Sequence, residues 1–264
     1  MPTAPASTNS RRVILLGASN LTVGFPLLLE SLPAGATGPV DLLAALGHGR
    51  SFGMSSRVLF RELPGIIDCG LWETLKSREE SAATVQALVT DVGNDLIYGA
   101  SVAQTLHWVE TCLARLAEQQ ADIVLTLLPM GSVEKLSPLR YHQTKMIFFP
   151  GKGPKWSEML ERVYHLNDEL QALGARYGAR LVHQRAEWYG FDPIHIRRRQ
   201  RCSAWREILS GWTDFDEAAV ATSPSWSTRL QFAQWRPAER RMFGRRQTTT
   251  QPIHKSAELT VSLF

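Results

Sequence analysis

The sequence lacks long hydrophobic runs. None of its 264 residues belongs to a stretch approaching the roughly 20 apolar residues that a membrane-spanning helix needs. The earliest apolar run, residues 13–16, ends at Gly17 and is too short for the core of a signal peptide. We therefore expect a cytoplasmic protein with no membrane span.

Cysteine is also scarce. The chain has only Cys69, Cys112 and Cys202, an odd number at wide spacing with no Cys-x-x-Cys pair. This pattern argues against a disulfide framework or a zinc ribbon and favours free thiols in a reducing compartment. The sequence also lacks clustered histidines or carboxylates at metal-ligand spacing, and Gly17 begins no Gly-x-Gly-x-x-Gly. We expect no metal and no cofactor.

Neither disorder nor an extreme charge is indicated for the chain as a whole. Hydrophobic residues make up 44% and charged residues 20% of the sequence, and the formal net charge is +4. The positive charge is uneven, because residues 195–264 hold twelve Lys and Arg against six Asp and Glu. Length and composition fit one large α/β domain, or one domain with a basic extension.

Strand-like and helix-like segments alternate along the chain. Short apolar runs predict strands over 13–16, 40–46, 84–92, 122–128 and 179–183, and helical periodicity predicts helices over 22–32, 101–120 and 155–177. A helix over 55–63 is conceivable, and 129–154 suggests a long loop. Strands that alternate with helices favour a three-layer α/β/α fold around a mostly parallel, five-stranded sheet.

We divide the chain into three parts on this basis. Residues 1–12 are expected to form a flexible tail, 13–212 the α/β domain, and 213–264 a basic C-terminal extension that could dock on the domain. From Arg197 onward the chain interleaves arginines with Trp205, Trp212, Trp226 and Trp235, a composition that could serve RNA, an anionic surface or simple packing. Nucleic-acid binding is a remote alternative, because no recognised module is present.

Polar clusters follow four of the predicted strands. In chain order they are Gly17-Ala18-Ser19-Asn20, Gly47-His48-Gly49-Arg50, Gly93-Asn94-Asp95 and Asp192-Pro193-Ile194-His195. Parallel α/β sheets bind ligands beyond the carboxyl ends of their strands, so these clusters can meet at one edge. The pattern favours a site built from all four.

The residue types suit nucleophilic catalysis. A serine hydroxyl needs a neighbouring base and a third group that orients the base. His195 is the candidate base and Asp192, three residues earlier, the candidate orienting carboxylate. Each residue also has a simpler interpretation: Ser19 as a helix N-cap, Asn94 as a turn residue and His195 as an ordinary loop histidine.

This arrangement resembles the GDSL/SGNH hydrolase superfamily over roughly residues 13–212. The resemblance implies ester hydrolysis through Ser19, His195 and Asp192 with an acyl-enzyme intermediate. It also implies an oxyanion hole formed by the N–H groups of Ser19 and Gly49 and the side-chain amide of Asn94. Gly47 and Gly53 are alternatives to Gly49. The expected substrate is an ester of a small molecule, carbohydrate or lipid, with the acyl and leaving groups undefined.

One position departs from the family pattern. The usual Gly-Asp-Ser is here Gly17-Ala18-Ser19, so the hydrogen bonds that the aspartate would make to the nucleophile loop should be missing. This weakens the expected rate and makes an inactive binding protein on the same scaffold conceivable. An acyltransferase, in which a sugar or other hydroxyl captures the same acyl-enzyme, is a separate alternative.

Overall fold

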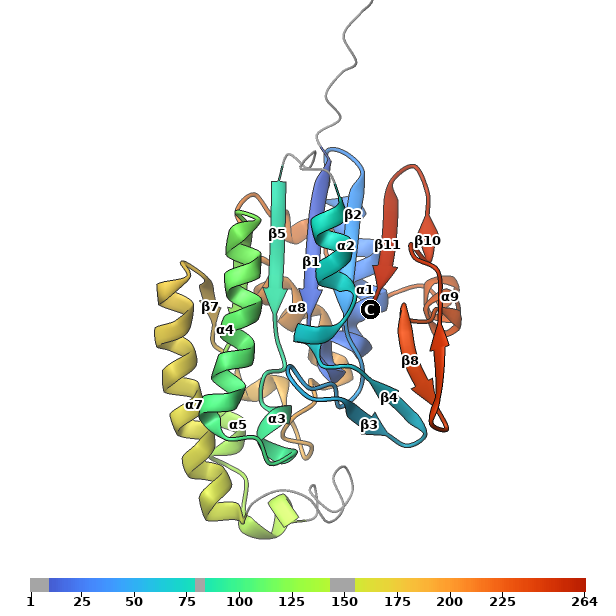
Figure 1. Cartoon of the computed structure of the whole chain (residues 1–264). Coiled ribbons are helices and arrows are strands. Elements are labelled where there is room, and N and C mark those ends of the chain that lie inside the picture. Colours follow the sequence, from blue (N-terminus) through green and yellow to red (C-terminus); the bar gives the residue numbers. More distant parts are fainter. Residues whose placement is uncertain (1–9, 79–83, 143–154) are drawn as a thin grey trace, which may run out of the picture.

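The computed structural model describes residues 10–78, 84–142 and 155–264. Its centre is a seven-stranded sheet in the order β10-β11-β2-β1-β5-β6-β7 (Figure 1). The strands are β1 (Arg11–Leu16), β2 (Val40–Ala45), β5 (Thr84–Val89), β6 (Asp122–Thr126), β7 (Arg180–Val182), β10 (His254–Lys255) and β11 (Leu259–Leu263). All neighbours are parallel except β10 and β11.

Helices cover both faces of this sheet. The principal ones are α1 (Ser19–Ala34), α2 (Leu71–Ser77), α4 (Val102–Glu118), α7 (Trp156–Arg176) and α8 (Arg201–Leu209). Alternate residues of β1 enter different cores: Ile14 packs in the cluster with α2, α4 and α7, whereas Val13 packs in the cluster with α1 and α8. The expected three-layer α/β/α class is therefore confirmed, and it explains why β1 is buried over its whole length.

The expected number of strands was wrong. The C-terminal segment supplies two strands, because β11 pairs in parallel with β2 and β10 pairs with β11. Thr260 and Ser262 interrupt the apolar residues of β11, so the segment has no continuous apolar run like those of the central strands. At the end of the expected domain, the buried indole N–H of Trp212 donates to the carbonyl of Ala87 in β5 at 2.9 Å.

The segment 55–63 is a hairpin rather than a helix. Strands β3 (Ser56–Val58) and β4 (Arg61–Leu63) form a four-stranded antiparallel sheet with β8 (Glu239–Met242) and β9 (Arg245–Thr248). Leu59 has φ 54°, which ends any helical path, and β4 pairs with β8, almost 180 residues later. A partner so distant in sequence leaves no local pattern to detect.

The remaining elements are short, apart from one exposed helix. They are α3 (Asn94–Ile97), α5 (Met130–Val133), α9 (Trp226–Gln234) and the 3-10 helices Ile66–Asp68, Ala186–Trp188, Arg198–Gln200 and Glu217–Ala219. The interpretation of 129–154 as a loop misses α5, and its part over 143–154 lies outside the described residues, as do residues 1–9 of the expected tail. Ser101 caps α4, as predicted, through a reciprocal pair of bonds with Gln104.

The two remaining sequence expectations concern membranes and thiols. Within the described ranges, no helix combines the length and apolar character needed to cross a bilayer. Cys69, Cys112 and Cys202 are free thiols, the first two buried.

Candidate active site

Three of the predicted loops are neighbours because their strands are neighbours. β1 pairs in parallel with β2 on one side and with β5 on the other. Ser19 opens α1 directly after β1, Gly49 lies in the loop after β2, and Asn94 opens α3 after β5. The sheet therefore brings the three residues to one edge.

The fourth loop carries a hydrogen-bonded acid and imidazole. Asp192 Oδ2 lies 2.6 Å from Nδ1 of His195, while Oδ1 accepts the N–H groups of Ile194 and His195 at 3.0 and 3.2 Å. Burial raises the pKa of Asp192, but the hydrogen bond and charge of His195, with the two N–H bonds, lower that pKa below its ordinary value. The carboxylate is thus held ionised and bonded to the imidazole.

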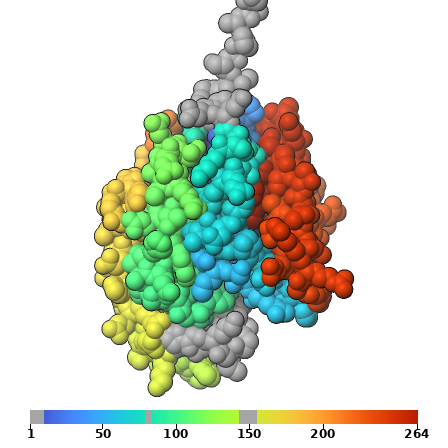
Figure 2. All heavy atoms as spheres, viewed as in Figure 1, coloured from blue at the N-terminus to red at the C-terminus, as the bar shows by residue number. Residues whose placement is uncertain are grey.

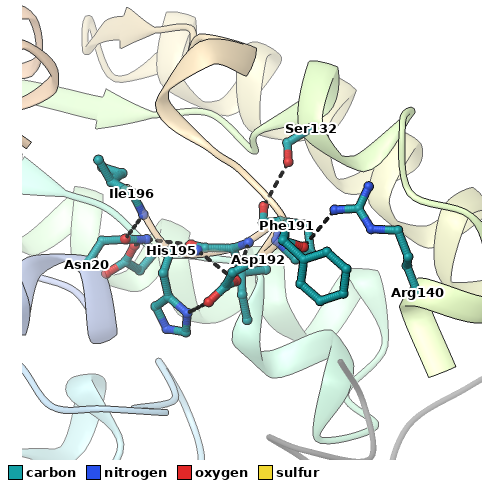
Figure 3. A network of polar contacts seen from close by, with 10 residues as sticks. Asn20, Ser132, Arg140, Phe191, Asp192, His195 and Ile196 are labelled. Carbon is teal, nitrogen blue, oxygen red and sulfur yellow. Dashed lines mark hydrogen bonds and ion pairs between the residues drawn. The ribbon is translucent and has the colours of Figure 1, made fainter. Parts of the chain in front are cut away.

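Asn20 joins this loop to the nucleophile helix (Figure 3). Its Nδ2 donates to the carbonyl of Ile194 at 2.8 Å, and its Oδ1 accepts the N–H of Ile196 at 2.8 Å. The two bonds fix the backbone on either side of His195 to the residue that follows Ser19. The histidine is therefore placed beside the start of α1.

Ser132 and Arg140 bind the part of the same loop that precedes Ile194. Ser132 donates to the carbonyl of Pro193 at 3.1 Å, and Arg140 donates to the carbonyls of Gly190 and Phe191 at 3.1 and 2.6 Å (Figure 3). The guanidinium also lies over the Phe191 ring, 5.0 Å from its centroid. The loop is thus held at both ends, an arrangement that favours a fixed imidazole position.

Asp91, in the loop after β5, supports the nucleophile loop. Its Oδ2 accepts the N–H groups of Ala18 and Leu21 at 3.0 and 3.1 Å, and the Nδ2 of Asn20 donates to its Oδ1 at 2.8 Å. Ala18 itself contributes no carboxylate, but one reaches the nucleophile loop from elsewhere in the chain. The carboxylate comes from another strand end, and the only sequence signal for it is a polar residue directly before Val92 and Gly93.

The loop after β2 is built around Gly49. Its φ is +63°, and a Cβ there would lie 2.7 Å from the Tyr98 hydroxyl, which donates to the Gly49 carbonyl at 2.6 Å. Asn94 Nδ2 reaches the carbonyl of Arg50 at 3.4 Å. Two side chains from the region of α3 therefore contact the loop that carries Gly49. Burial raises the pKa of Tyr98 to about 12, so its hydroxyl stays protonated and donating.

The residues that flank these motifs have structural roles. Arg50 is fully buried and donates to the carbonyls of Leu46, Pro64 and Phe264. Asp95, also buried, accepts bonds from the Ser51 hydroxyl and the Phe52 N–H. Burial raises the pKa of Asp95 to about 6. Arg50 and Asp95 thus hold the Gly49 loop from inside the protein rather than reaching a ligand.

A largely apolar pocket opens beside the nucleophile. Ser19, Asn20 and Asn94 are among the residues that line it. Its apolar wall comes from α3, α7 and the region around α5, and includes Ile97, Leu128, Leu136, Trp156, Met159 and Val163. Ile194 borders the pocket, whereas His195 is absent from its described lining.

No family model matches the chain, and no curated protein matches it. Several solved structures resemble it. They include the psychrotrophic esterase EstA from Pseudoalteromonas sp. (13% identity, TM-score 0.44, covering 75% of this chain and 95% of that one). The acetyl xylan esterase AlAXEase has 14% identity, a TM-score of 0.48 and coverages of 75% and 98%. AlinE4, an SGNH-hydrolase family esterase, has 19% identity, a TM-score of 0.40 and coverages of 76% and 92%.

Of these three, AlinE4 carries the name of the family that the sequence motifs resemble. The function proposed below is argued from the arrangement of the site in this chain.

The contacts of Asp91 generate a stability prediction. Asp91→Asn should lower the free energy of unfolding by about 1–3 kcal/mol, because an amide nitrogen would replace one accepting oxygen opposite N–H donors. Urea titration followed by circular dichroism measures the change.

Asp214→Asn is the matched control, since Asp214 also has a positive φ of 58° but is exposed. It should change the free energy of unfolding by less than about 0.5 kcal/mol. Equal effects of the two substitutions would contradict a supporting role for the Asp91 carboxylate.

Proposed function

We propose that the protein is a serine hydrolase that cleaves carboxylic esters with Ser19 as nucleophile, His195 as base and Asp192 as orienting carboxylate. The observation that carries this proposal is the Asn20 bridge. It ties both peptide neighbours of His195 to the residue after Ser19, while Asp192 bonds the imidazole at 2.6 Å.

The chemistry follows from the tautomer that Asp192 favours. A carboxylate that accepts from Nδ1 leaves Nε2 as the basic nitrogen. Nε2 takes the proton of Ser19 as its Oγ attacks the ester carbonyl, and later gives that proton to the leaving alcohol. In the second step Nε2 takes a proton from a water molecule, which attacks the acyl-enzyme. Nε2 then returns the proton to Ser19 Oγ as the carboxylic acid leaves.

Negative charge develops on the carbonyl oxygen during both steps. The N–H groups of Ser19 and Gly49 and the amide of Asn94 are the proposed donors. Two observations support this assignment. Gly49 has a positive φ, and the side chain of Asn94 contacts the carbonyl of Arg50, the residue after Gly49. Each such donor typically lowers the barrier by about 2.7–4 kcal/mol.

The apolar pocket suits the acyl group of the ester. The general acid must reach the leaving oxygen, so the leaving alcohol lies against His195. The pocket includes Ser19 and Asn94 but not His195, and its wall is apolar. An acyl chain that extends away from the imidazole would therefore enter it, which favours esters with an apolar acyl chain over acetyl esters.

Ser19→Ala tests the nucleophile. It should lower kcat on p-nitrophenyl esters by at least ~10³-fold, because no other group can form the acyl-enzyme. Labelling of the protein by a fluorophosphonate should disappear together with activity. The thermal transition should be unchanged.

The exposed Ser55 offers a control that also removes one hydroxyl. Ser55→Ala should keep wild-type activity and labelling. Undiminished hydrolysis by purified Ser19→Ala would rule out Ser19 as the nucleophile.

Asp192→Asn tests the orienting carboxylate. It should lower the plateau of kcat by roughly 10²–10⁴-fold, because the imidazole loses the acceptor that fixes its tautomer. Steady-state kinetics on p-nitrophenyl esters measure the plateau. If it matches wild type, another group orients His195.

Acyl length tests the pocket. The wild-type protein should hydrolyse p-nitrophenyl octanoate with a higher kcat/KM than p-nitrophenyl acetate. Val163→Trp should lower kcat/KM for the octanoate by roughly tenfold or more, because the indole fills the pocket. It should leave kcat/KM for the acetate unchanged. Glu161→Trp places the same side chain at an exposed position of α7 and should change neither rate. Equal losses on both esters would contradict an acyl pocket.

A further inference from the structure

Two hairpins present large apolar side chains to solvent at their turns. Leu59 and Phe60 connect β3 to β4, and Phe243 follows β8. Their exposed fractions are 82%, 55% and 68%. We call these three residues the apolar tip. The pair Phe60 and Phe243 stacks with ring centroids 4.7 Å apart, and the N–H of Phe243 donates to the carbonyl of Phe60 at 2.9 Å, so the two turns form one unit.

Turn geometry does not account for these residue types. Leu59 and Phe243 have φ values of 54° and 50°, where hairpin turns favour glycine, asparagine or aspartate. A bulky residue in this conformation is strained by about 1–2 kcal/mol, and burial does not offset the strain at an exposed tip. The exposed apolar side chains therefore indicate that this surface binds a partner outside the chain.

The charge around the apolar tip is strongly positive. The two hairpins hold six arginines against two glutamates, a surplus equal to the +4 of the entire chain. The arginines are Arg57, Arg61, Arg240, Arg241, Arg245 and Arg246, of which Arg57, Arg241, Arg245 and Arg246 are exposed. Arg246 pairs with Glu239 at 2.8 Å. A partner for this surface must combine an apolar interior with negative charge.

The hairpins also lie next to the candidate active site. Val58 of β3 is a neighbour of Gly49, and Arg61 of β4 donates to the carbonyl of His48 at 3.4 Å. In Figure 1, β3, β4 and β8 lie together at one corner of the molecule, and in Figure 2 the same segments meet at the surface. A partner bound at the apolar tip would thus lie close to the loop that carries Gly49.

We propose that the apolar tip and its surrounding arginines dock the protein on an anionic lipid surface. Leu59, Phe60 and Phe243 insert among the acyl chains, and the arginines bind lipid phosphates, the two contributions that stable peripheral binding requires. Single-stranded nucleic acid fits less well, because the Phe60 and Phe243 rings stack on each other and Leu59 offers no stacking surface. Docking does not depend on the proposed reaction.

Vesicle sedimentation tests the docking. The wild-type protein should sediment with phosphatidylcholine vesicles that contain phosphatidylglycerol, bind pure phosphatidylcholine more weakly, and be released from the anionic vesicles as salt rises. Arg241→Gln/Arg245→Gln should lower the partition coefficient on anionic vesicles by about fivefold per arginine. Leu59→Ser/Phe60→Ser/Phe243→Ser should lower it by roughly tenfold or more on both vesicle types.

Trp226→Ser/Leu230→Ser is the matched control, because it removes two exposed apolar side chains from α9, with exposed fractions of 80% and 61%. It should bind vesicles like wild type. Circular dichroism establishes that each variant is folded, and the arginine pair tests docking even if the triple variant is not.

Three results would overturn the inference. The first is vesicle binding that neither the arginine pair nor the apolar triple lowers. The second is absent vesicle binding together with binding of polyuridine that depends on the apolar tip. The third is a dimer in light scattering that the triple variant dissociates, again without vesicle binding, which would identify a second copy of the chain as the occupant.

Discussion

The carboxylate of Asp91 is the constraint on which the geometry of the candidate site depends. It binds the backbone at Ala18 and Leu21 on both sides of Ser19, and it orients the Asn20 amide. Asn20 then holds the backbone around His195. A chain of hydrogen bonds therefore runs from the loop after β5 through the nucleophile loop to the histidine loop.

Buried polar groups perform the same task on the other side of the site. Asp95 accepts hydrogen bonds from the Ser51 hydroxyl and the Phe52 N–H, and Arg50 donates to three carbonyls that come from different parts of the chain. One of these is the carbonyl of Phe264, the residue directly after β11. The C-terminal segment thus does more than extend the sheet, because Phe264 helps to fix the loop that contains Gly49.

The two apolar features of the molecule, the pocket near Ser19 and the apolar tip, differ in their exposure to solvent. The pocket near Ser19 is apolar and partly enclosed, which suits an acyl chain removed from water. The apolar tip is exposed and ringed by positive charge, which suits a surface that is itself apolar inside and anionic outside. Both features would serve an enzyme whose ester substrates lie in or near a lipid layer.

Local sequence patterns were sufficient for the class of fold and for the list of candidate residues. The apolar runs at 13–16, 40–46 and 84–92 predicted buried parallel strands, because such strands need apolar residues on both faces. Polar clusters after the predicted strands contain Ser19, Gly49, Asn94, Asp192 and His195. The family resemblance gave these residues their catalytic roles, which remain predictions. The 3.6-residue period and the Ser101 cap predicted α4 closely.

Long-range pairing was decided only by the tertiary structure. The β3–β4 hairpin is paired with β8, and β11 is paired with β2, across separations at which no local period can signal the contact. The same holds for Asp91, whose role depends on the register of β1 against β5. Sequence could show that Ala18 lacks a carboxylate. Only the sheet could bring a carboxylate from another strand to its N–H, because hydrogen bonds depend on position in space and not on order in the chain.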